Sequence, residues 1–315
     1  MNLTDPRFQT AEKAREWLER QRWPYGVHCT HCGSFSVTGL SGKAHRPGVY
    51  QCNDCRQQFT VTTGSVMERS KIPLNKWLMA MHLMASSKKG YSAHQLHRTL
   101  GITYQSAWFL AHRIREAMAD TKREPMGGEG KIVEADTTYI GGKEKNKPLG
   151  KRDRKKIGGM GKQIVHTLVE RGGRARSEHI ANISGKTLRP MLVKNASRKS
   201  TLATDTAGGY MDVGKEFARH EMVDHGKEEY VRGDAHTNTV EGFFSILKRG
   251  INGTFHHVSE AHLHRYLAEF DFRYNNRSSL GVEDTERTGK IIEQTAGKRL
   301  TYRRTRQAQN AQAEG

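Results

Sequence analysis

The chain has 315 residues, and its 52 Lys and Arg outnumber its 33 Asp and Glu to give a formal net charge of +19. That length predicts two to three domains at ~100 to 200 residues each, and the basic excess favours a polyanionic partner, because basic side chains displace counterions from nucleic-acid phosphates. No apolar run approaches the roughly 18 residues of a membrane span, and the charged N-terminus does not resemble a signal peptide, so we expect a cytoplasmic protein with no membrane partner.

The four cysteines form two pairs with the same short spacing. Cys29 and Cys32 make the first pair, Cys52 and Cys55 make the second, and residues 33–51 separate them. This spacing is typical of a structural zinc ribbon, in which four thiolates complete a tetrahedral Zn²⁺ site and leave no open position for catalysis. The role of such a ribbon stays open, since structural zinc modules serve DNA contacts, protein contacts or domain stability. We assign residues 1–64 to an N-terminal helix and this zinc-ribbon β module.

Residues 92–118 have the pattern of a helix-turn-helix. A short helix over 92–100, a turn at 101–103 and a longer helix over 104–118 match that motif. In the longer helix, small and apolar side chains recur at helical spacing and are expected to face inward. Other positions are then left for a DNA groove and its phosphates: Gln105, Ser106, His112, Arg113 and Arg115. Helical hairpins are common, so the pattern permits DNA binding without requiring it. We assign residues 65–125 to this helical module.

A glycine-rich break at 126–130 precedes a region of alternating strands and helices. Strands are predicted at 131–140, 166–170, 178–183 and 200–205, with a helix at 187–195. This order predicts an α/β layered domain, which we assign to residues 130–285. The basic segment 143–156 fits either a phosphate-tracking hairpin or a solvated loop.

Two aspartates follow short strand-forming stretches in similar contexts. Asp136 follows Ile-Val-Glu-Ala, and Asp205 follows Thr-Leu-Ala-Thr. A lone aspartate at a strand end usually caps a turn, but adjacent strands would bring these two together. Mg²⁺ or Mn²⁺ prefers carboxylate oxygens, so two strand aspartates and a helix glutamate would suit a two-metal site for phosphoryl transfer.

Residues 236–250 supply the candidate glutamate. One column of the predicted helix is apolar at helical spacing and forms a core anchor: Val240, Phe243, Phe244, Leu247 and Ile251. A second column beside it is polar: Asn238, Glu241, Ser245 and Lys248. By itself Glu241 fits a solvated helix charge. Together with Asp136 and Asp205 it becomes the candidate third carboxylate.

Ordered motifs along nearly the whole chain carry a family resemblance. They are WPYGVHCTHCG from Trp23, QCNDCRQQFTVTTGSVMERSKIPLNKW, SAWFLAHRIREAM, EADTTYIGGKEK, HTNTVEGFFSILKRGINGTFHHVS, and EFDFRYNNR ending at Arg277. In these motifs the chain resembles the bacterial insertion-sequence DDE transposases that have an N-terminal zinc ribbon. The resemblance implies a ribonuclease-H-like catalytic domain with a mixed sheet, acting on bacterial nucleoid DNA.

The resemblance also implies site residues. It places Asp136 on the first strand of the catalytic domain, Asp205 on the fourth and Glu241 on a late helix, and it places Lys248 and the neighbouring Arg249 against terminal DNA. Some relatives have asparagine or histidine in the third acidic position, so Asn238 and His236 are alternatives to Glu241.

The implied reaction is metal-assisted hydrolysis at the element end, followed by attack of the freed 3′-hydroxyl on target DNA. Terminal inverted repeats and target duplexes are the expected partners, and joining two ends implies a homo-oligomer. Two alternatives remain: a ribonuclease-H-like nuclease or resolvase that cuts without joining, and a zinc-ribbon, helix-turn-helix regulator. A last helix is predicted over 260–275, and residues 286–315 are expected to form a polar, disordered tail.

Overall fold

The structure, a computed structural model, describes residues 4–121, 124–142, 146–152, 160–223 and 236–301. The chain divides into two compact units. The first comprises Met1–Ser87, Tyr91–Met118 and Glu283–Gly315, and the second comprises Lys88–Gly90 and Ala119–Val282. Within the described ranges no helix is both long and apolar enough to cross a membrane.

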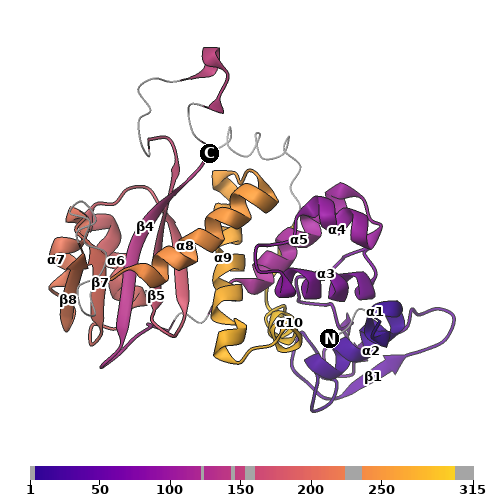
Figure 1. The fold of residues 1–315 in the computed structure, drawn as a ribbon. Coiled ribbons are helices and arrows are strands. Elements are labelled where there is room, and N and C mark those ends of the chain that lie inside the picture. Colours follow the sequence, from indigo (N-terminus) through magenta and orange to yellow (C-terminus); the bar gives the residue numbers. More distant parts are fainter. Residues whose placement is uncertain (1–3, 122–123, 143–145, 153–159, 224–235, 302–315) are drawn as a thin grey trace, which may run out of the picture. The chain divides into compact units, whose positions relative to one another are not determined.

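The first unit begins with two helices and a small sheet (Figure 1). Its elements are α1 (Pro6–Gln9), α2 (Ala11–Arg22), β1 (Val37–Leu40), β2 (Val49–Cys52) and β3 (Gln58–Phe59). The three strands form an antiparallel sheet in the order β1-β2-β3. Trp23 ends α2 and packs edge-on against Tyr50 and Phe59, with ring centroids 5.7 and 5.9 Å away. Burial of this indole fixes the sheet to the end of the helix.

The rest of the first unit is helical. Its helices are α3 (Leu74–Ser86), α4 (Ala93–Leu100), α5 (Tyr104–Met118) and α10 (Asp284–Glu293). A capping box starts α4, in which Ser92 and Gln95 bond each other's backbone N–H groups. Gly101 ends α4 in the left-handed region at φ 57°, which glycine adopts without strain. The two helices and the intervening turn confirm the secondary structure predicted for residues 92–118.

Helix α10 corrects the prediction of a disordered tail over 286–315. Ile291 and Ile292 are buried, and Thr288 Oγ1 lies 3.1 Å from His82 Nδ1 on α3. The prediction is therefore wrong for residues 286–301, while 302–315 lie outside the described residues. The polar composition of the segment did not prevent it from folding, because several of its polar groups are buried and hydrogen-bonded within the unit. The Arg287 guanidinium, for example, donates to the Ala85 carbonyl.

The second unit is built on a five-stranded mixed sheet in the order β6-β5-β4-β7-β8. Its strands are β4 (Ile132–Ile140), β5 (Gln163–Glu170), β6 (Ala175–Ile180), β7 (Thr201–Asp205) and β8 (Arg219–Val223). β4, β5 and β6 pair antiparallel, whereas β7 runs parallel to both β4 and β8. The expected α/β domain with a mixed sheet is confirmed. Of the basic segment 143–156, residues 143–145 and 153–156 lie outside the described part of the chain.

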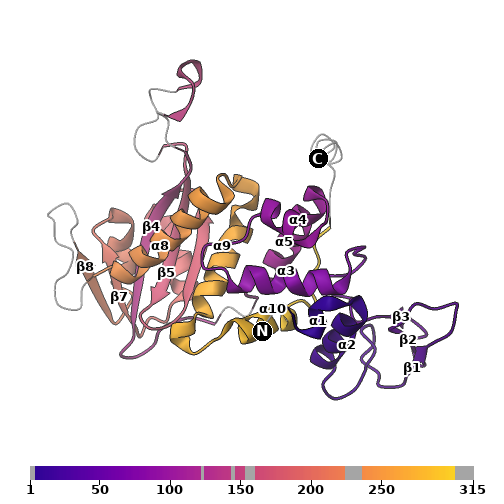
Figure 2. The same cartoon turned by 45° about the vertical axis from the view of Figure 1, so that its right-hand side comes forward.

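Helices cover both faces of this sheet (Figure 1 and Figure 2). α6 (Gly185–Asn195), η3 (Gly208–Tyr210) and α7 (Met211–Gly214) pack on one face. α8 (Asn238–Gly250), the π-helical η5 (Ile251–Phe255) and α9 (Glu260–Asn275) pack on the other. Short 3-10 turns occur at η2 (Leu149–Lys151) and η6 (Ser278–Leu280). Side chains alternate between the faces of a strand, so the even-numbered residues of β4 face α8 and α9.

Helix α9 also protects the β6 edge of the sheet. Asp271 accepts a hydrogen bond from Ser177 N–H at 2.7 Å, and Asn275 accepts one from Ala175 N–H at 2.6 Å. The Asn275 amide donates back to the Ala175 carbonyl at 3.0 Å. One helical turn separates Asp271 from Asn275, so both side chains lie along the strand and satisfy an edge that would otherwise be open for pairing.

Candidate active site and zinc site

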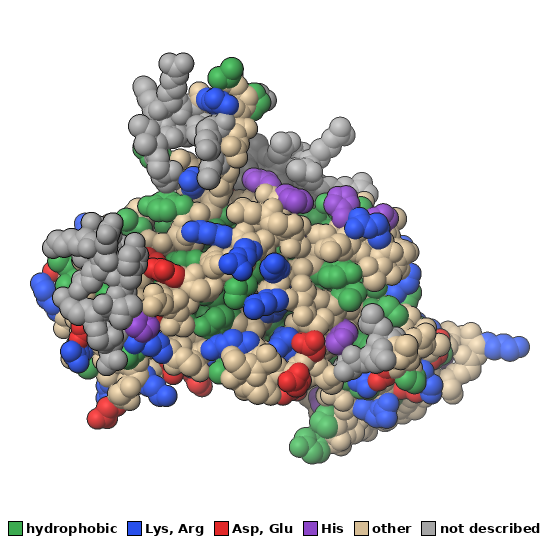
Figure 3. Space-filling view, in the orientation of Figure 1, with side chains coloured by type: hydrophobic (Ala, Val, Ile, Leu, Met, Phe, Trp, Pro, Cys, Tyr) green, Lys and Arg blue, Asp and Glu red, His purple; other side chains and the backbone are tan. Residues whose placement is uncertain are grey.

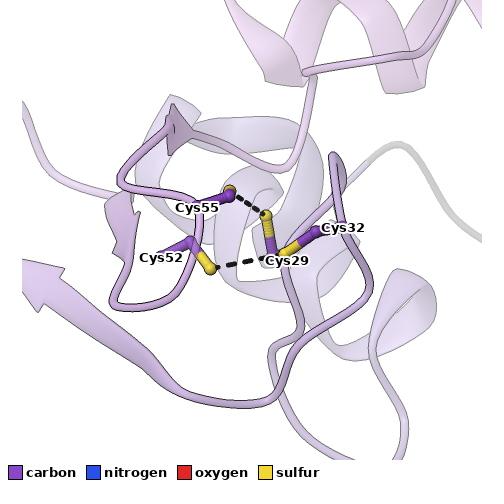
Figure 4. Close-up of side chains that lie close together, drawn as sticks. All are labelled: Cys29, Cys32, Cys52 and Cys55. Atoms are coloured by element: carbon purple, nitrogen blue, oxygen red, sulfur yellow. Dashed lines mark hydrogen bonds between the residues drawn. The ribbon is translucent and has the colours of Figure 1, made fainter.

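The four cysteine thiols of the first unit converge from the turn that carries Cys29 and Cys32 and from the end of β2 and the turn after it, which carry Cys52 and Cys55 (Figure 4). Cys29 Sγ lies 3.6 Å from Cys55 Sγ, Cys32 Sγ lies 3.6 Å from Cys52 Sγ, and all four atoms lie within 4.8 Å of one another. A tetrahedral Zn²⁺ with Zn–S bonds of about 2.3 Å separates its sulfurs by about 3.8 Å, so this spacing fits one metal ion. Gly33, at φ 82°, supplies the left-handed turn after the first pair.

The cysteines are the only such group in the part of the chain that the structure describes. No other three His, Cys, Asp or Glu side chains there bring ligand atoms close enough to share one ion. Neither His28 nor His31 joins the thiols, so neither competes with them in this arrangement.

Asp136 and Asp205 lie beside each other in the second unit. The parallel register of β4 and β7 pairs Glu134 with Ala203 and Ala135 with Thr204, so the next step aligns Asp136 with Asp205. Alternation along the strands places both carboxylates on the sheet face covered by α8. The two aspartates are thus adjacent, although residues 137–204 separate them in the sequence.

The Asp136 carboxyl group has an unusual environment. Its pKa is raised from 3.8 to about 7, mainly by burial and also by the charges of Asp205 and Glu241, while the Thr137 N–H and Lys248 act in the opposite direction. The Thr137 N–H donates to Asp136 Oδ1 at 2.6 Å. The electrostatic effect of Glu241 and Lys248 on Asp136 means that these two side chains of α8 lie close enough for their charges to act on this carboxyl group.

Glu241 lies in the first turn of α8, next to the buried Val240 and on the exposed side of the helix. Its Oε1 accepts a hydrogen bond from Thr237 Oγ1 at 3.3 Å. Asn238 begins the helix and is also exposed. His236 is placed differently. Its Nδ1 lies 3.2 Å from Glu134 Oε1, but the two atoms are not oriented to form a hydrogen bond. His236 therefore faces a carboxylate other than Asp136.

The chemistry of these carboxylates suits hard cations. All the donors are oxygens, and a bound cation would offset the cost of ionising Asp136, which is buried and lies near two further acids. Among the described residues, the three groups do not come close enough together to share a single ion.

Glu134, which was not predicted from the sequence as a site residue, contacts the start of α8. Its side chain is 0% exposed, lies on the same face of β4 as Asp136, and accepts hydrogen bonds from the backbone of Thr239 and Val240. A charged residue within the apolar Ile-Val-Glu-Ala stretch, two positions before a candidate metal ligand, was the available signal.

The structure corrects the predicted DNA-facing surface of α5. His112 and Arg115 are buried, and Arg113 is buried between the rings of Trp77 and Phe109. One Arg113 guanidinium nitrogen, Nη2, donates to the Glu68 carbonyl at 2.6 Å. These three side chains therefore do not face outward, because α5 is buried around most of its circumference over these turns.

Other predicted DNA-contacting residues are exposed. Gln105 lies in the first turn of α5, beside Tyr104, whose ring stacks on His94 of α4 at a centroid distance of 4.3 Å. In the second unit, Lys248 and Arg249 are exposed at the end of α8. Figure 3 shows Lys and Arg side chains gathered over the region of α8 and α9. The first turn of α5 and the last turn of α8 thus present polar or basic groups to a partner.

Known proteins match this chain in both units. The family described as an ISXO2-like transposase domain matches residues 127–275, and the transposase zinc-ribbon domain matches residues 9–58. A Halobacterium salinarum protein, described as an uncharacterized protein in transposable element ISH50, is 30% identical over 279 residues, covering 84% of this chain and 91% of that protein.

Among solved structures, a chain in the cryoEM structure of a simian T-cell lymphotropic virus intasome with the PP2A regulatory subunit B56 gamma matches with a TM-score of 0.27 and 13% identity. That match covers 57% of this chain and 66% of the other, and so low a score carries no argument about fold or function. The sequence matches do support a family assignment, because one family model covers the zinc ribbon and the other covers the carboxylate-bearing sheet. The chain belongs to the family of insertion-sequence transposases that combine a zinc-ribbon domain with an ISXO2-like transposase domain.

Proposed function

We propose that the chain is a DDE-type DNA transposase that cleaves at the ends of its element and joins the freed 3′-hydroxyl to target DNA. The observation that carries this proposal is the placement of Asp136 beside Asp205 on one sheet face, with Glu241 acting on Asp136 from the helix above. The fold of this unit is proposed to be ribonuclease-H-like, because a five-stranded mixed sheet with helices on both faces suits that architecture.

Each carboxylate has a proposed role. The charges of both Asp205 and Glu241 act on Asp136, and these three carboxylates would together hold Mg²⁺ or Mn²⁺. Bound ions would activate the attacking oxygen and stabilise the leaving one. Lys248, exposed at the end of α8, would hold a phosphate or base next to the cleavage site.

The remaining modules are proposed to bind and order DNA. The four cysteines would hold Zn²⁺ and keep residues 1–64 folded, and residues 65–125 would bind the terminal repeat through the first turn of α5, where Tyr104 and Gln105 are exposed. Residues 130–285 would then carry the chemistry. Joining two ends requires at least two copies of the chain in the assembled complex.

A strand-transfer assay with an end-repeat duplex, a target plasmid and Mg²⁺ tests the proposal. Asp136→Ala and Asp205→Ala should abolish cleavage and joining while still binding the duplex. Glu241→Ala should do the same, and full activity in that variant would reject Glu241 as third ligand, with Asn238→Ala and His236→Ala tested beside it as the alternatives. Cleaved ends without joined products would favour a nuclease or resolvase, and binding without cleavage would favour a DNA-binding regulator.

A further inference from the structure

The first turn of α8 is held by a carboxylate from another element. Glu134 Oε2 accepts the Thr239 N–H at 2.8 Å and the Val240 N–H at 2.9 Å, while Glu134 Oε1 accepts the Thr239 hydroxyl at 2.8 Å. Free N–H groups at a helix start are usually satisfied by the residue that precedes the helix. Here Thr237 holds that position, but its side chain makes no capping bond and instead donates to Glu241.

Arg171, just after β5, completes the arrangement. Its Nε donates to Glu134 Oε1 at 2.6 Å, and its Nη2 donates to the His236 carbonyl at 2.9 Å. The Glu134 carboxylate thus has a positive partner, hydrogen bonds to α8 and the favourable end of the helix dipole, which together offset the cost of burying its charge. Because Arg171 also binds the backbone just before α8, it holds the entry to the helix against the sheet.

The position of this contact relates it to the proposed metal site. Glu134 precedes Asp136 by two residues on the same strand face, and the Val240 N–H that it binds belongs to the residue just before Glu241. One buried side chain therefore joins the strand that carries the first carboxylate to the helix turn that carries the third. Rotation of α8 by one residue, about 100°, would carry Glu241 away from the aspartates.

We propose that Glu134 is a positioning residue, which sets the distance and orientation of Glu241 relative to Asp136 by tying the start of α8 to β4. This inference rests on the proposed function, because it takes Asp136 and Glu241 to be metal ligands. Glu134 itself binds no metal. Residues that orient metal ligands are commonly worth about 10- to 100-fold in metal affinity, and Glu134 belongs to this class.

The test uses the full chain with zinc in its ribbon, without DNA. Fe²⁺ with ascorbate and peroxide replaces Mg²⁺ and cuts the backbone next to its ligands, and mass spectrometry maps the cuts. In the wild type we expect cuts near Asp136, Asp205 and Glu241. Glu134→Gln replaces one of the two accepting oxygens with an NH2 group, which would face either the backbone N–H groups of α8 or Arg171, and it removes the negative charge. The cuts near Glu241 should then disappear while those near Asp136 remain.

A binding measurement accompanies the cleavage map. Mn²⁺ affinity, measured by electron paramagnetic resonance, should fall about 10- to 100-fold in Glu134→Gln. Glu178→Gln is the matched control, because Glu178 is also a strand glutamate bonded to a helix, through Asn195 at 3.3 Å, but on the opposite sheet face. That variant should keep the wild-type cuts and affinity.

The outcomes separate the two proposals. The positioning role would be overturned if the wild type is cut at all three places and Glu134→Gln shows the same cuts and the same Mn²⁺ affinity. The metal site would then still stand. Absence of all three cuts in the wild type would overturn the metal site itself. If Glu134→Gln does not fold, Thr239→Val removes only the hydroxyl contact to Glu134, and it should weaken Mn²⁺ binding and the cuts near Glu241. Wild-type behaviour of that folded variant would equally reject the positioning role.

Discussion

Asp136 and Asp205 occupy neighbouring positions across the parallel pair β4 and β7, and both face α8. Parallel strands bring residues from distant parts of the chain into register, which is how Asp136, in the middle of β4, and Asp205, at the end of β7, become a pair. Ionisation of Asp136 is unfavourable when no cation is present, because the group is buried and because the charges of Asp205 and Glu241 oppose it. The first prediction follows from this cost.

Replacing Asp136 with Asn should stabilise the Mg²⁺-free protein at pH 8. The folded-state pKa of Asp136 is raised from 3.8 to about 7, so between these values the folded state binds more protons and loses stability as pH rises. Asn cannot ionise, so the variant escapes this loss of stability, which is at most about 4 kcal/mol. Urea unfolding of both proteins at pH 8 and pH 4, with zinc retained, measures the difference in their free energies of unfolding.

The control for that measurement is Asp212→Asn, because the Asp212 side chain is 97% exposed. It should leave the unfolding free energy unchanged at both pH values. Added Mg²⁺ should stabilise the wild type and not Asp136→Asn. Equal stability of wild type and Asp136→Asn at pH 8 would contradict the proposed crowding of charge.

His166 is predicted to make the protein sensitive to mild acid. It is buried on the α6 face, its two ring nitrogens have no hydrogen-bond partner within the described structure, and burial lowers its pKa from 6.5 to about 4. As pH falls from 6.5 towards 4, the unfolded state takes up the proton first, so stability should drop by about 3 kcal/mol. In His166→Leu this part of the pH dependence should vanish, as unfolding curves at pH 7 and pH 4.5 would reveal.

An exposed histidine serves as the comparison for His166. His257→Leu should keep the acid sensitivity of the wild type, since its side chain is exposed. If His166→Leu retained the full loss of stability between pH 6.5 and pH 4, the loss would have to come from other groups.

Zinc binding should depend on the cysteines and not on the neighbouring histidines. Cys52→Ala should lose the metal and unfold the β1-β2-β3 sheet, because its thiol is buried within the four-sulfur group. His31→Ala should retain one zinc per chain, as its side chain lies outside that group. Metal analysis and limited proteolysis of residues 23–60 measure both, and zinc loss in His31→Ala would show that the ligand set is wrong.

Two substitutions in α5 should have opposite effects on stability and DNA binding. Arg113→Ala should lower the unfolding free energy by about 2 kcal/mol or more, since it removes the packing on Trp77 and Phe109 and the bond to the Glu68 carbonyl. Gln105→Ala should leave stability unchanged and weaken binding of the end repeat by about 1–3 kcal/mol. Thermal unfolding and fluorescence anisotropy distinguish them, and a Gln105→Ala variant with wild-type affinity would remove α5 from the DNA interface.

Local patterns in the sequence were sufficient for some features and not for others. The cysteine spacing predicted the ribbon, and the glycine and capping residues predicted α4 and α5 to within a residue or two. Those features depend on neighbours in sequence. Helical periodicity did not reveal that Arg113 is inside, because a helix buried around most of its surface has no consistent polar face. Polar composition likewise concealed α10, whose polar groups are paired inside the unit.

The sequence by itself determined the family, and it predicted the four cysteine ligands for zinc and the three candidate carboxylates, since each is carried by short motifs. Only the tertiary structure decided that Asp136 and Asp205 are adjacent, because that depends on the order β4-β7 in the sheet and on their parallel register. The same holds for Glu134, whose partners Thr239 and Val240 lie more than a hundred positions away along the chain. A buried carboxylate is stable only where donors converge on it, and convergence is a property of the folded arrangement and not of any local pattern.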